Sequence, residues 1–353
     1  MTNMRDIRMA LGAGITAAGL LTSTVSASPF LYTHDHGVTL PLPHRDVIQL
    51  SNPTWLENIA VRSNGDLLLT VLGYPEAAIY SVSGPASGAA PSLTTIGDFS
   101  SANYLLGIAE PAPDLFVVVG SATDAATNGT TWPAWRLDFR DRGGEPAIEV
   151  IGRIDDATVL NGVAALPENS DVVLVADSSG GLVWRLDITT GAYERAIQVP
   201  EMGFAANASS PTGVNGVKVC AGYLYWTNSY TQTIYRVGIT RDGFAAEGAE
   251  VEMVGELDAT FLDDFAIGDD GIIWAATDFD NRLFAVQPFG QNVVVEGGVT
   301  QFTLAGDTSA AFGRGETDKH ILYVATNGAL RVPINGTSEG GKVVAIDTQS
   351  FRF

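Results

Sequence analysis

One short sequence pattern recurs six times along the chain, and it constrains the fold more than any other feature. Each copy is a phrase such as WLENIAV, from Trp55, followed by turn residues and a hydrophobic run such as DLLLTVL. The copies repeat at intervals of about 50 residues, which is typical of the blades of a β-propeller. The pattern therefore predicts an all-β fold, a six-bladed β-propeller without helices of note. The aligned copies share six anchor positions, which are Glu57, Leu106, Asn161, Asn215, Asp263 and Thr308.

The repeat also predicts how the chain is divided. Blades bury their faces only by stacking on neighbours, so residues 46–353 are predicted to form one domain, although 353 residues would allow two. A propeller closes its ring to avoid exposed strand edges. The alternating stretch DVIQL, residues 46–50, is therefore expected to pair with the last blade beside GKVVAID, residues 341–347. Residues 28–45 are predicted to form an N-terminal arm across the fold.

The first 27 residues differ in kind from the rest. Arg5 and Arg8 form a charged start, an apolar stretch follows, and Val25-Ser26-Ala27 supplies a small-residue cleavage pattern. Residues 1–27 are therefore predicted to be a secretory signal peptide, with an uncleaved anchor as the alternative. The prediction places the protein in the secretory pathway or outside the cell, with no membrane contact after cleavage. Three glycosylation sequons suit that location, at Asn128, Asn207 and Asn335.

Charge and cysteine content exclude some classes of partner and linkage. A formal net charge of −21 is expected to repel nucleic acid and anionic membranes, although acidity also simply keeps a β-rich protein in solution. Cys220 is the only cysteine, so no intramolecular disulfide forms. Its apolar neighbours predict a buried, inert thiol. The sequence leaves the oligomeric state open.

The residue that opens each inner strand of a propeller points toward the central channel, where small molecules bind. Five of the six anchors are polar, with Leu106 as the apolar gap. The alternative is that these residues only cap turns, and the aromatic residues beside them would equally serve packing between blades. The candidate catalytic residues are Glu57, Asn161, Asn215, Asp263 and the adjacent Asp264. The candidate substrate-binding residues are Trp55, Tyr104, Leu106, Trp132, Tyr230, Phe261, Thr308 and Ser309.

The candidate catalytic residues supply carboxylate and amide oxygens, and no His or Cys joins them. An oxygen-only set suits a hard cation such as calcium and disfavours zinc or iron. The same groups can also act without a metal. Glu57 can donate a hydrogen bond when it is protonated, and Asn amides can polarise a carbonyl group. No GxSxG, Walker, dinucleotide-binding or HExxH motif occurs in the chain.

Across roughly residues 45–350 the chain resembles the SMP-30/gluconolactonase-like superfamily of six-bladed propellers. In that family a Glu, an Asn and an Asp bind a divalent cation. Glu57 in PTWLEN, Asn161 in VLNGVA and Asp263 in FLDDFA match those positions, so the resemblance implies that these three residues hold any bound cation. Leu106 stands where lactonases have a polar substrate contact, and Asp264 replaces the usual Gly. A sugar lactone is therefore not the expected substrate.

The amino-acid sequences of the repeats more closely resemble those of one fungal branch of that superfamily. PLPHR, NPTWLENIAVR, NGDLLLT, LLGIAE, LNGVAAL, TGVNGVKV, DDFAIG and TSAAFGR resemble secreted proteins of fungal secondary-metabolite clusters. Some members look like hetero-Diels–Alderases, which join a reactive quinone methide to a polyene terpene in tropolone–sesquiterpenoid pathways. The resemblance implies a cyclase with an apolar pocket at the channel mouth and a small hydrophobic natural product as substrate. No cofactor is required for such a cycloaddition.

Two other hypotheses remain open at the level of sequence. The first is a calcium-dependent lactonase or esterase, in which the cation polarises an ester carbonyl and stabilises the oxyanion. The second is a non-enzymatic propeller that binds a small molecule, because a fold does not fix a function.

Overall fold

The fold was obtained as a computed structural model that describes residues 32–33, 38–140 and 145–353. The predicted signal peptide at residues 1–27 lies outside the described residues. Residues 28–31 and 34–37 of the predicted arm also lie outside them, whereas residues 32–33 and 38–45 of the arm are described. Residues 33–353 form one compact unit.

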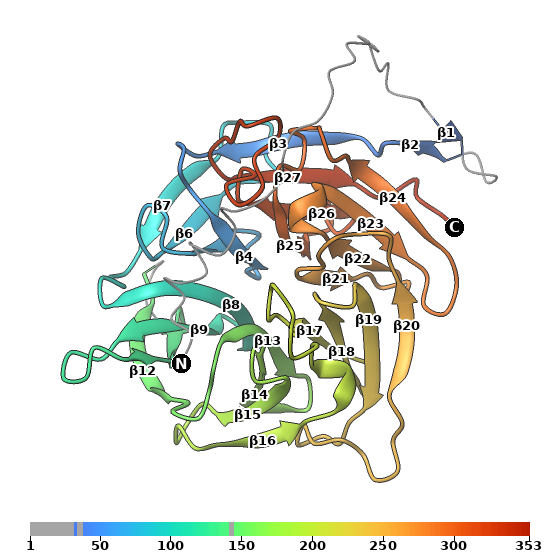
Figure 1. Ribbon diagram of the computed structural model, residues 1–353. Coiled ribbons are helices and arrows are strands. Elements are labelled where there is room, and N and C mark those ends of the chain that lie inside the picture. Colours follow the sequence, from blue (N-terminus) through green and yellow to red (C-terminus); the bar gives the residue numbers. More distant parts are fainter. Residues whose placement is uncertain (1–31, 34–37, 141–144) are drawn as a thin grey trace, which may run out of the picture. The chain divides into compact units, whose positions relative to one another are not determined.

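That unit is a ring of six antiparallel blades, which confirms the predicted six-bladed β-propeller (Figure 1). The inner strands stand around the axis of the ring, and each contacts the inner strands of the two neighbouring blades. The inner strands are β4 (Leu56–Val61), β8 (Ala102–Ala112), β13 (Leu160–Leu166), β17 (Val214–Cys220), β21 (Phe265–Ile267) and β25 (Asp307–Phe312).

The remaining strands of each blade follow in order toward the rim. The second strands are β5 (Leu67–Val71), β9 (Leu115–Thr123), β14 (Asn169–Asp177), β18 (Tyr223–Asn228), β22 (Ile273–Ala276) and β26 (Ile321–Thr326). The third strands are β6 (Ala78–Ser83), β11 (Pro133–Asp138), β15 (Leu182–Asp187), β19 (Thr233–Gly238), β23 (Arg282–Val286) and β27 (Lys342–Asp347). The outer strands are β7 (Ser92–Ile96), β12 (Ala147–Arg153), β16 (Tyr193–Ile197), β20 (Glu252–Glu256), β24 (Asn292–Gly297) and β3 (His44–Gln49).

Only short elements lie outside this scheme in the described residues. They are β1 (Tyr32–Thr33), β2 (Thr39–Leu40), β10 (Thr130–Thr131) and the 3₁₀ turns η1 (Pro200–Met202) and η2 (Asp278–Asp280). Residues 120–132 are partly strand, because β9 continues to Thr123 and β10 pairs with it.

The ring is closed by the N-terminal strand, as the sequence predicts. β3 pairs antiparallel with β27, with Ile48 opposite Val343 and Asp46 opposite Val344, and the two strands lie side by side in Figure 1. The strand begins at His44, two residues before the predicted start. Nδ1 of His44 lies 2.8 Å from Oε2 of Glu296 in the neighbouring blade, so this strand is also tied to β24.

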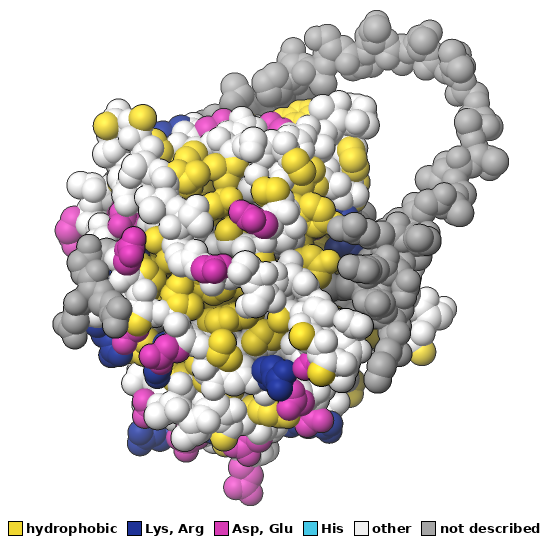
Figure 2. Space-filling model, turned by 90° about the vertical axis from the view of Figure 1, so that its left-hand side faces the viewer, with side chains coloured by type: hydrophobic (Ala, Val, Ile, Leu, Met, Phe, Trp, Pro, Cys, Tyr) yellow, Lys and Arg dark blue, Asp and Glu magenta, His cyan; other side chains and the backbone are white. Residues whose placement is uncertain are grey.

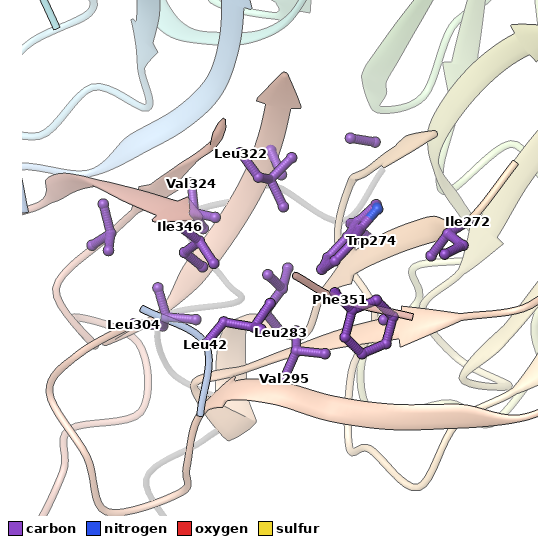
Figure 3. Packing of buried hydrophobic residues seen from close by; sticks show 14 of the residues in the cluster. Leu42, Ile272, Trp274, Leu283, Val295, Leu304, Leu322, Val324, Ile346 and Phe351 are labelled. Atoms are coloured by element: carbon purple, nitrogen blue, oxygen red, sulfur yellow. The ribbon is translucent and has the colours of Figure 1, made fainter. Parts of the chain in front are cut away.

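Hydrophobic side chains fill the spaces between blades. Figure 3 shows the cluster that joins the fifth and sixth blades, where Trp274 lies close to Phe351. Their ring centroids are 5.3 Å apart in an edge-to-face arrangement. Leu42, which precedes β3, packs into the same cluster with Leu322. Each large apolar side chain removed from water contributes about 1.5–3 kcal/mol, so such clusters hold neighbouring blades together without disulfides.

Strand direction places one set of loops on the same face of the ring. Strands of a blade alternate in direction, so the loops between second and third strands lie on the face where the inner strands begin. The connections from each outer strand to the next inner strand also lie there. We call this face the anchor face. The three predicted sequons are exposed and lie in such loops, at Asn128, Asn207 and Asn335.

The opposite face carries the hairpins between first and second strands. Gly271, between β21 and β22, has φ +81, the left-handed conformation that the Asp270-Gly271 pair predicts for a hairpin turn. Cys220, at the end of β17 on this side, is half-buried rather than buried, because the inner strand emerges from the core where the hairpin begins.

The surface is mixed in character. Figure 2, which shows the side of the ring on the left of Figure 1, displays hydrophobic side chains among polar ones, with acidic and basic groups scattered between them. Large hydrophobic residues exposed elsewhere in the described chain include Met253 and Phe289. Within the residues described, no helix has the length and apolar character needed to span a bilayer.

Candidate active site

Five of the six anchor positions coincide with irregularities in the pairing of the inner strands, and Asp263 lies just before its strand. The pairing of β4 with β5 shifts between Leu56 and Asn58, so Glu57 is the extra residue of a β-bulge. A bulge turns a side chain out of the regular alternation of the sheet. The repeated sequence pattern therefore corresponds to a β-bulge that recurs from blade to blade. Equivalent shifts enclose Leu106, Asn161, Asn215 and Thr308.

Glycine follows the anchor in the second, third and fourth blades. A Cβ atom at Gly107 would lie 2.4 Å from the backbone oxygen of Asn161, and one at Gly162 would lie 2.5 Å from that of Asn215. Only glycine permits an approach this close between two backbones. The anchor residues of adjacent blades are therefore held next to each other.

Asn215 and Asp263 form a buried pair at two adjacent anchors. Nδ2 of Asn215 donates to Oδ1 of Asp263 and to Oγ of Ser229, each at 3.0 Å. Within the described part of the chain, Oδ1 of Asn215 has no hydrogen-bond partner, although the residue is 2% exposed. A buried oxygen without a partner costs about 1–3 kcal/mol. It therefore marks a position where a ligand can supply the missing donor.

Glu57 adds a second buried acid. Its Oε2 accepts a 2.6 Å hydrogen bond from Nε1 of Trp55. Burial, and then the charge of Asp278, raise the pKa of Glu57 to about 8, although the Trp55 bond and Arg331 oppose that shift. Burial, with the charges of Glu57 and Asp278, also raises the pKa of Asp263 well above its ordinary value. The site therefore disfavours several negative charges at once.

Asp278 and Arg331 lie outside the anchors, and sequence reasoning missed both. They belong to the loops that join the second and third strands of the fifth and sixth blades. Asp278 accepts a 2.6 Å hydrogen bond from Nδ2 of Asn327. Burial raises the pKa of Asp278 to about 6 against the opposing charge of Arg331. Among the described residues, the guanidinium group of Arg331 is the one positive charge that lowers the pKa of both Glu57 and Asp278.

Aromatic rings border these charges. Phe261 and Phe279 stack with ring centroids 4.5 Å apart, and the guanidinium carbon of Arg331 lies 4.9 Å from the centre of the Phe279 ring. Trp55, which donates a hydrogen bond to Glu57, stacks on Tyr74 with ring centroids 6.3 Å apart. The predicted residues Trp55 and Phe261 therefore lie beside the polar group, whereas Phe279 and Tyr74 were not predicted.

Asp264, a predicted catalytic residue, is engaged in a network that joins four blades. Nζ of Lys218 lies 2.6 and 2.7 Å from its two carboxylate oxygens. Nδ2 of Asn58 and Oγ of Ser309 donate to Oδ2 at 3.0 and 3.1 Å. The backbone N–H of Phe265 donates to Oδ1 at 2.8 Å. The predicted residues Asp264 and Ser309 therefore have a structural explanation that requires no substrate.

Other predicted substrate contacts also lie in packed surroundings. Leu106 and Trp132 are 2% and 5% exposed and belong to the hydrophobic cluster between the second and third blades, against which Tyr104 packs. The side chain of Leu106 therefore packs in the hydrophobic core between two blades and does not line the central channel. Oγ1 of Thr308 donates to the backbone oxygen of Leu56 at 2.8 Å and is fully buried.

Two predicted residues remain accessible. Asn161 is half-buried, and in the described chain its side chain forms no hydrogen bond. Tyr230 is 40% exposed in a loop of the anchor face. The structure thus brings Glu57, Asn215 and Asp263 into one polar group, with Asn161 at the next anchor along the ring.

The donor chemistry of this group fits a hard cation in part. Glu57 and Asp263 offer carboxylate oxygens, and the unpartnered Oδ1 of Asn215 offers an amide oxygen. Calcium takes 6–8 oxygens, so water would have to complete the shell. Among the residues that the structure describes, no three His, Cys, Asp or Glu side chains are grouped so as to hold a metal ion.

Two curated proteins are similar to the chain over most of its length. A "Putative hetero-Diels-Alderase" from Phoma sp is 35% identical over 320 residues, which cover 84% of this chain and 89% of the relative. A "Putative hetero-Diels-Alderase asR5" from Sarocladium schorii is 35% identical over 347 residues, which cover 89% of this chain and 85% of the relative. No protein-family model matches the chain.

Solved structures share the fold at low sequence identity. A luciferin-regenerating enzyme superposes with a TM-score of 0.61 at 14% identity, covering 88% of this chain and 96% of that protein. A calcium-binding protein, regucalcin, from Agrobacterium tumefaciens superposes with a TM-score of 0.58 at 13% identity, covering 88% and 95%. These likenesses show the propeller fold and nothing about chemistry.

Proposed function

Because the chain belongs to the hetero-Diels-Alderase family, we propose that it is a biosynthetic enzyme that catalyses a hetero-Diels–Alder cycloaddition at the anchor face. The proposed substrates are a quinone methide, as the oxygen-containing diene, and a polyene terpene, as the alkene. The observation that carries the proposal is the buried polar group of Glu57, Asn215 and Asp263, with its unpartnered amide oxygen and aromatic residues beside it. Such a site can orient a planar, apolar molecule that carries a few oxygens.

The chemistry requires little of the protein beyond orientation and polarisation. One C–C and one C–O bond form while three π bonds become one, and no atom, proton or electron leaves the pair of substrates. Holding the two reactants in a near-attack pose can lower the barrier by about 7–11 kcal/mol. A hydrogen bond to the oxygen of the quinone methide withdraws electron density from it and makes it more electrophilic. No cofactor is required for these steps.

Asn161 is the amide best placed to donate that hydrogen bond. Both N–H groups of Asn215 are already used, by Ser229 and Asp263. The amide of Asn161 occupies the adjacent anchor, is half-buried and has no partner in the described part of the chain. Asn215 and Glu57 then shape and polarise the deeper part of the site.

Replacing Asn161 by alanine is expected to slow the cycloaddition about tenfold and to loosen its stereochemistry, because one polarising hydrogen bond is lost. The reaction would be followed with a quinone-methide precursor and a humulene-type terpene, with products resolved by chiral chromatography. Asn169→Ala, at the opposite face of the same blade, is the matched control and should retain the rate. Equal rates and product ratios in both variants would contradict the role of Asn161. Tight terpenoid binding without any acceleration would favour a non-enzymatic binder.

A calcium-dependent lactonase or esterase is the second candidate, and the unpartnered Oδ1 of Asn215 beside Asp263 favours it. Glu57, Asn161 and Asp263 would hold the cation, with Asn215 as a further oxygen donor. When bound, the cation would polarise an ester carbonyl.

Chelation separates the two candidates. If the cycloaddition is the activity, treatment with EDTA is expected to leave its rate unchanged, because the proposed donors are amide and carboxyl groups. The same preparation should show no ester hydrolysis when calcium is restored. Hydrolysis of a lactone panel that disappears with EDTA, returns with calcium and is absent in Asp263→Asn would establish the second candidate instead.

A further inference from the structure

Arg331 presents a positive charge at the anchor face without an acid partner. Its guanidinium carbon lies 4.9 Å from the centre of the Phe279 ring and 5.9 Å from that of Phe261. In the described chain it forms no ion pair and no hydrogen bond. Its charge nevertheless acts on Glu57 and Asp278, which places it beside the polar group of the candidate site. The donors of this guanidinium are therefore available to a ligand.

The loop that carries Arg331 is fixed on both sides of it. A Cβ atom at Gly328 would lie 2.0 Å from the backbone oxygen of Glu339, so the loop folds tightly against its own return segment. Ala329 is 2% exposed, and its N–H donates to the backbone oxygen of Ala305 at 3.1 Å. Ile334 is buried in the same small cluster. Arg331 thus projects from a fixed loop, which reduces the entropy lost when it binds a ligand.

The geometry of a guanidinium group limits what it recognises. Two parallel N–H groups of an arginine match two oxygens that lie side by side, as in a carboxylate, and one ammonium group does not. A planar ring packed against the Phe261–Phe279 pair would bring such oxygens close to Arg331, whose guanidinium carbon lies over the Phe279 ring. The substrate feature that this arrangement fits is a conjugated ring with a carbonyl next to a hydroxyl or enolate oxygen.

We propose that Arg331 is a substrate-binding residue that holds two adjacent oxygens on the conjugated ring of the electrophile, with that ring packed beside Phe279. The assignment rests on the proposed function, because it states how the same site holds and orients one of its two reactants. Asn161 then remains free to polarise the reacting oxygen, and the terpene packs on the aromatic side of Trp55 and Tyr74.

Binding of two small probes to the whole chain tests the assignment without turnover. Tropolone is planar and has two adjacent oxygens, and tropone has the same ring with one. Isothermal titration is expected to show that Arg331→Gln weakens tropolone binding at least tenfold, the usual effect of losing a charged hydrogen bond. Arg331→Lys keeps the positive charge but lacks the two parallel N–H groups, so it should reduce the preference for tropolone over tropone. Arg195→Gln is the matched control, because Arg195 is exposed over the ring of Trp184 on another blade.

The outcomes separate this assignment from the proposed function. Equal tropolone affinity in the wild type and Arg331→Gln, or no saturable binding by the wild type, would overturn the assignment. An unchanged tropolone-to-tropone preference in both Arg331 variants would also overturn it, since a merely structural arginine would not affect that preference. Tropolone binding that depends on Arg331 in a protein that accelerates no cycloaddition would support the assignment and refute the proposed function.

Discussion

Replacing Asp264 by alanine is expected to lower the free energy of unfolding by at most about 3–5 kcal/mol, the cost of removing one partner of a fully buried ion pair, because the side chain of Lys218 is 29% exposed. Asp264 is 3% exposed and accepts hydrogen bonds from Lys218, Asn58 and Ser309. Without the carboxylate, an ammonium group and two polar side chains lose their common acceptor near the axis. Urea unfolding followed by tryptophan fluorescence measures the loss.

A double-mutant cycle shows whether the pair is the cause. Asp264→Asn combined with Lys218→Met removes both charges and is expected to recover most of the stability that either single change loses. Glu149→Ala is the control, because it breaks an exposed ion pair with Arg136 and should cost less than about 1 kcal/mol. If Asp264→Ala left stability intact but abolished the cycloaddition, Asp264 would be catalytic, as the sequence predicts.

The free energy of unfolding is expected to fall as the pH rises from about 5 to about 8.5. The pKa of Glu57 is about 8 in the folded protein, against an ordinary value of 4.5. Between these values the folded chain binds a proton that the unfolded chain has lost, so raising the pH favours unfolding. The expected loss from Glu57 is on the order of 2–4 kcal/mol. The raised pKa values of Asp263, Asp278 and Asp307 act in the same direction.

Glu57→Gln tests this pH dependence, because glutamine keeps the shape of the side chain and cannot ionise. Urea midpoints at about pH 5.5, 7 and 8.5 should fall less steeply for the variant, which should be more stable than the wild type at the highest pH. Glu316→Gln is the control, since the side chain of Glu316 is 94% exposed. A wild-type slope that Glu57→Gln leaves unchanged would show that other groups cause the pH dependence.

The sequence predicts the fold well because a propeller repeats its local rules. Hydrophobic runs recur as the buried second strands, and the anchor phrases recur as bulges at the start of the inner strands. Exposed strand edges are costly, so pairing of β3 with β27 also follows from the sequence. The grouping of Glu57, Asn215 and Asp263 could be predicted for the same reason, since equivalent positions of a ring face a common axis.

The rest of the site depends on features that do not repeat. Asp278 and Arg331 lie in loops whose paths are set by single residues, such as Asp278 itself with φ +47 and Gly328 with φ +74. The role of Asp264 depends on the reach of Lys218 from another blade, which no alignment of repeats reveals. Trp132 was predicted to contact the substrate, but it is buried in the hydrophobic cluster between the second and third blades.

Because the first strand of the ring pairs with the last, the ring can close only after the last strand has been synthesised. β3 is synthesised before every other blade strand, and its partner β27 is synthesised after all of them. During synthesis β3 remains an unpaired edge, which is the kind of segment that aggregates. Contacts between residues so distant in the chain also form slowly. A chain that stops before Lys342 can stack its earlier blades, but it cannot become a closed ring.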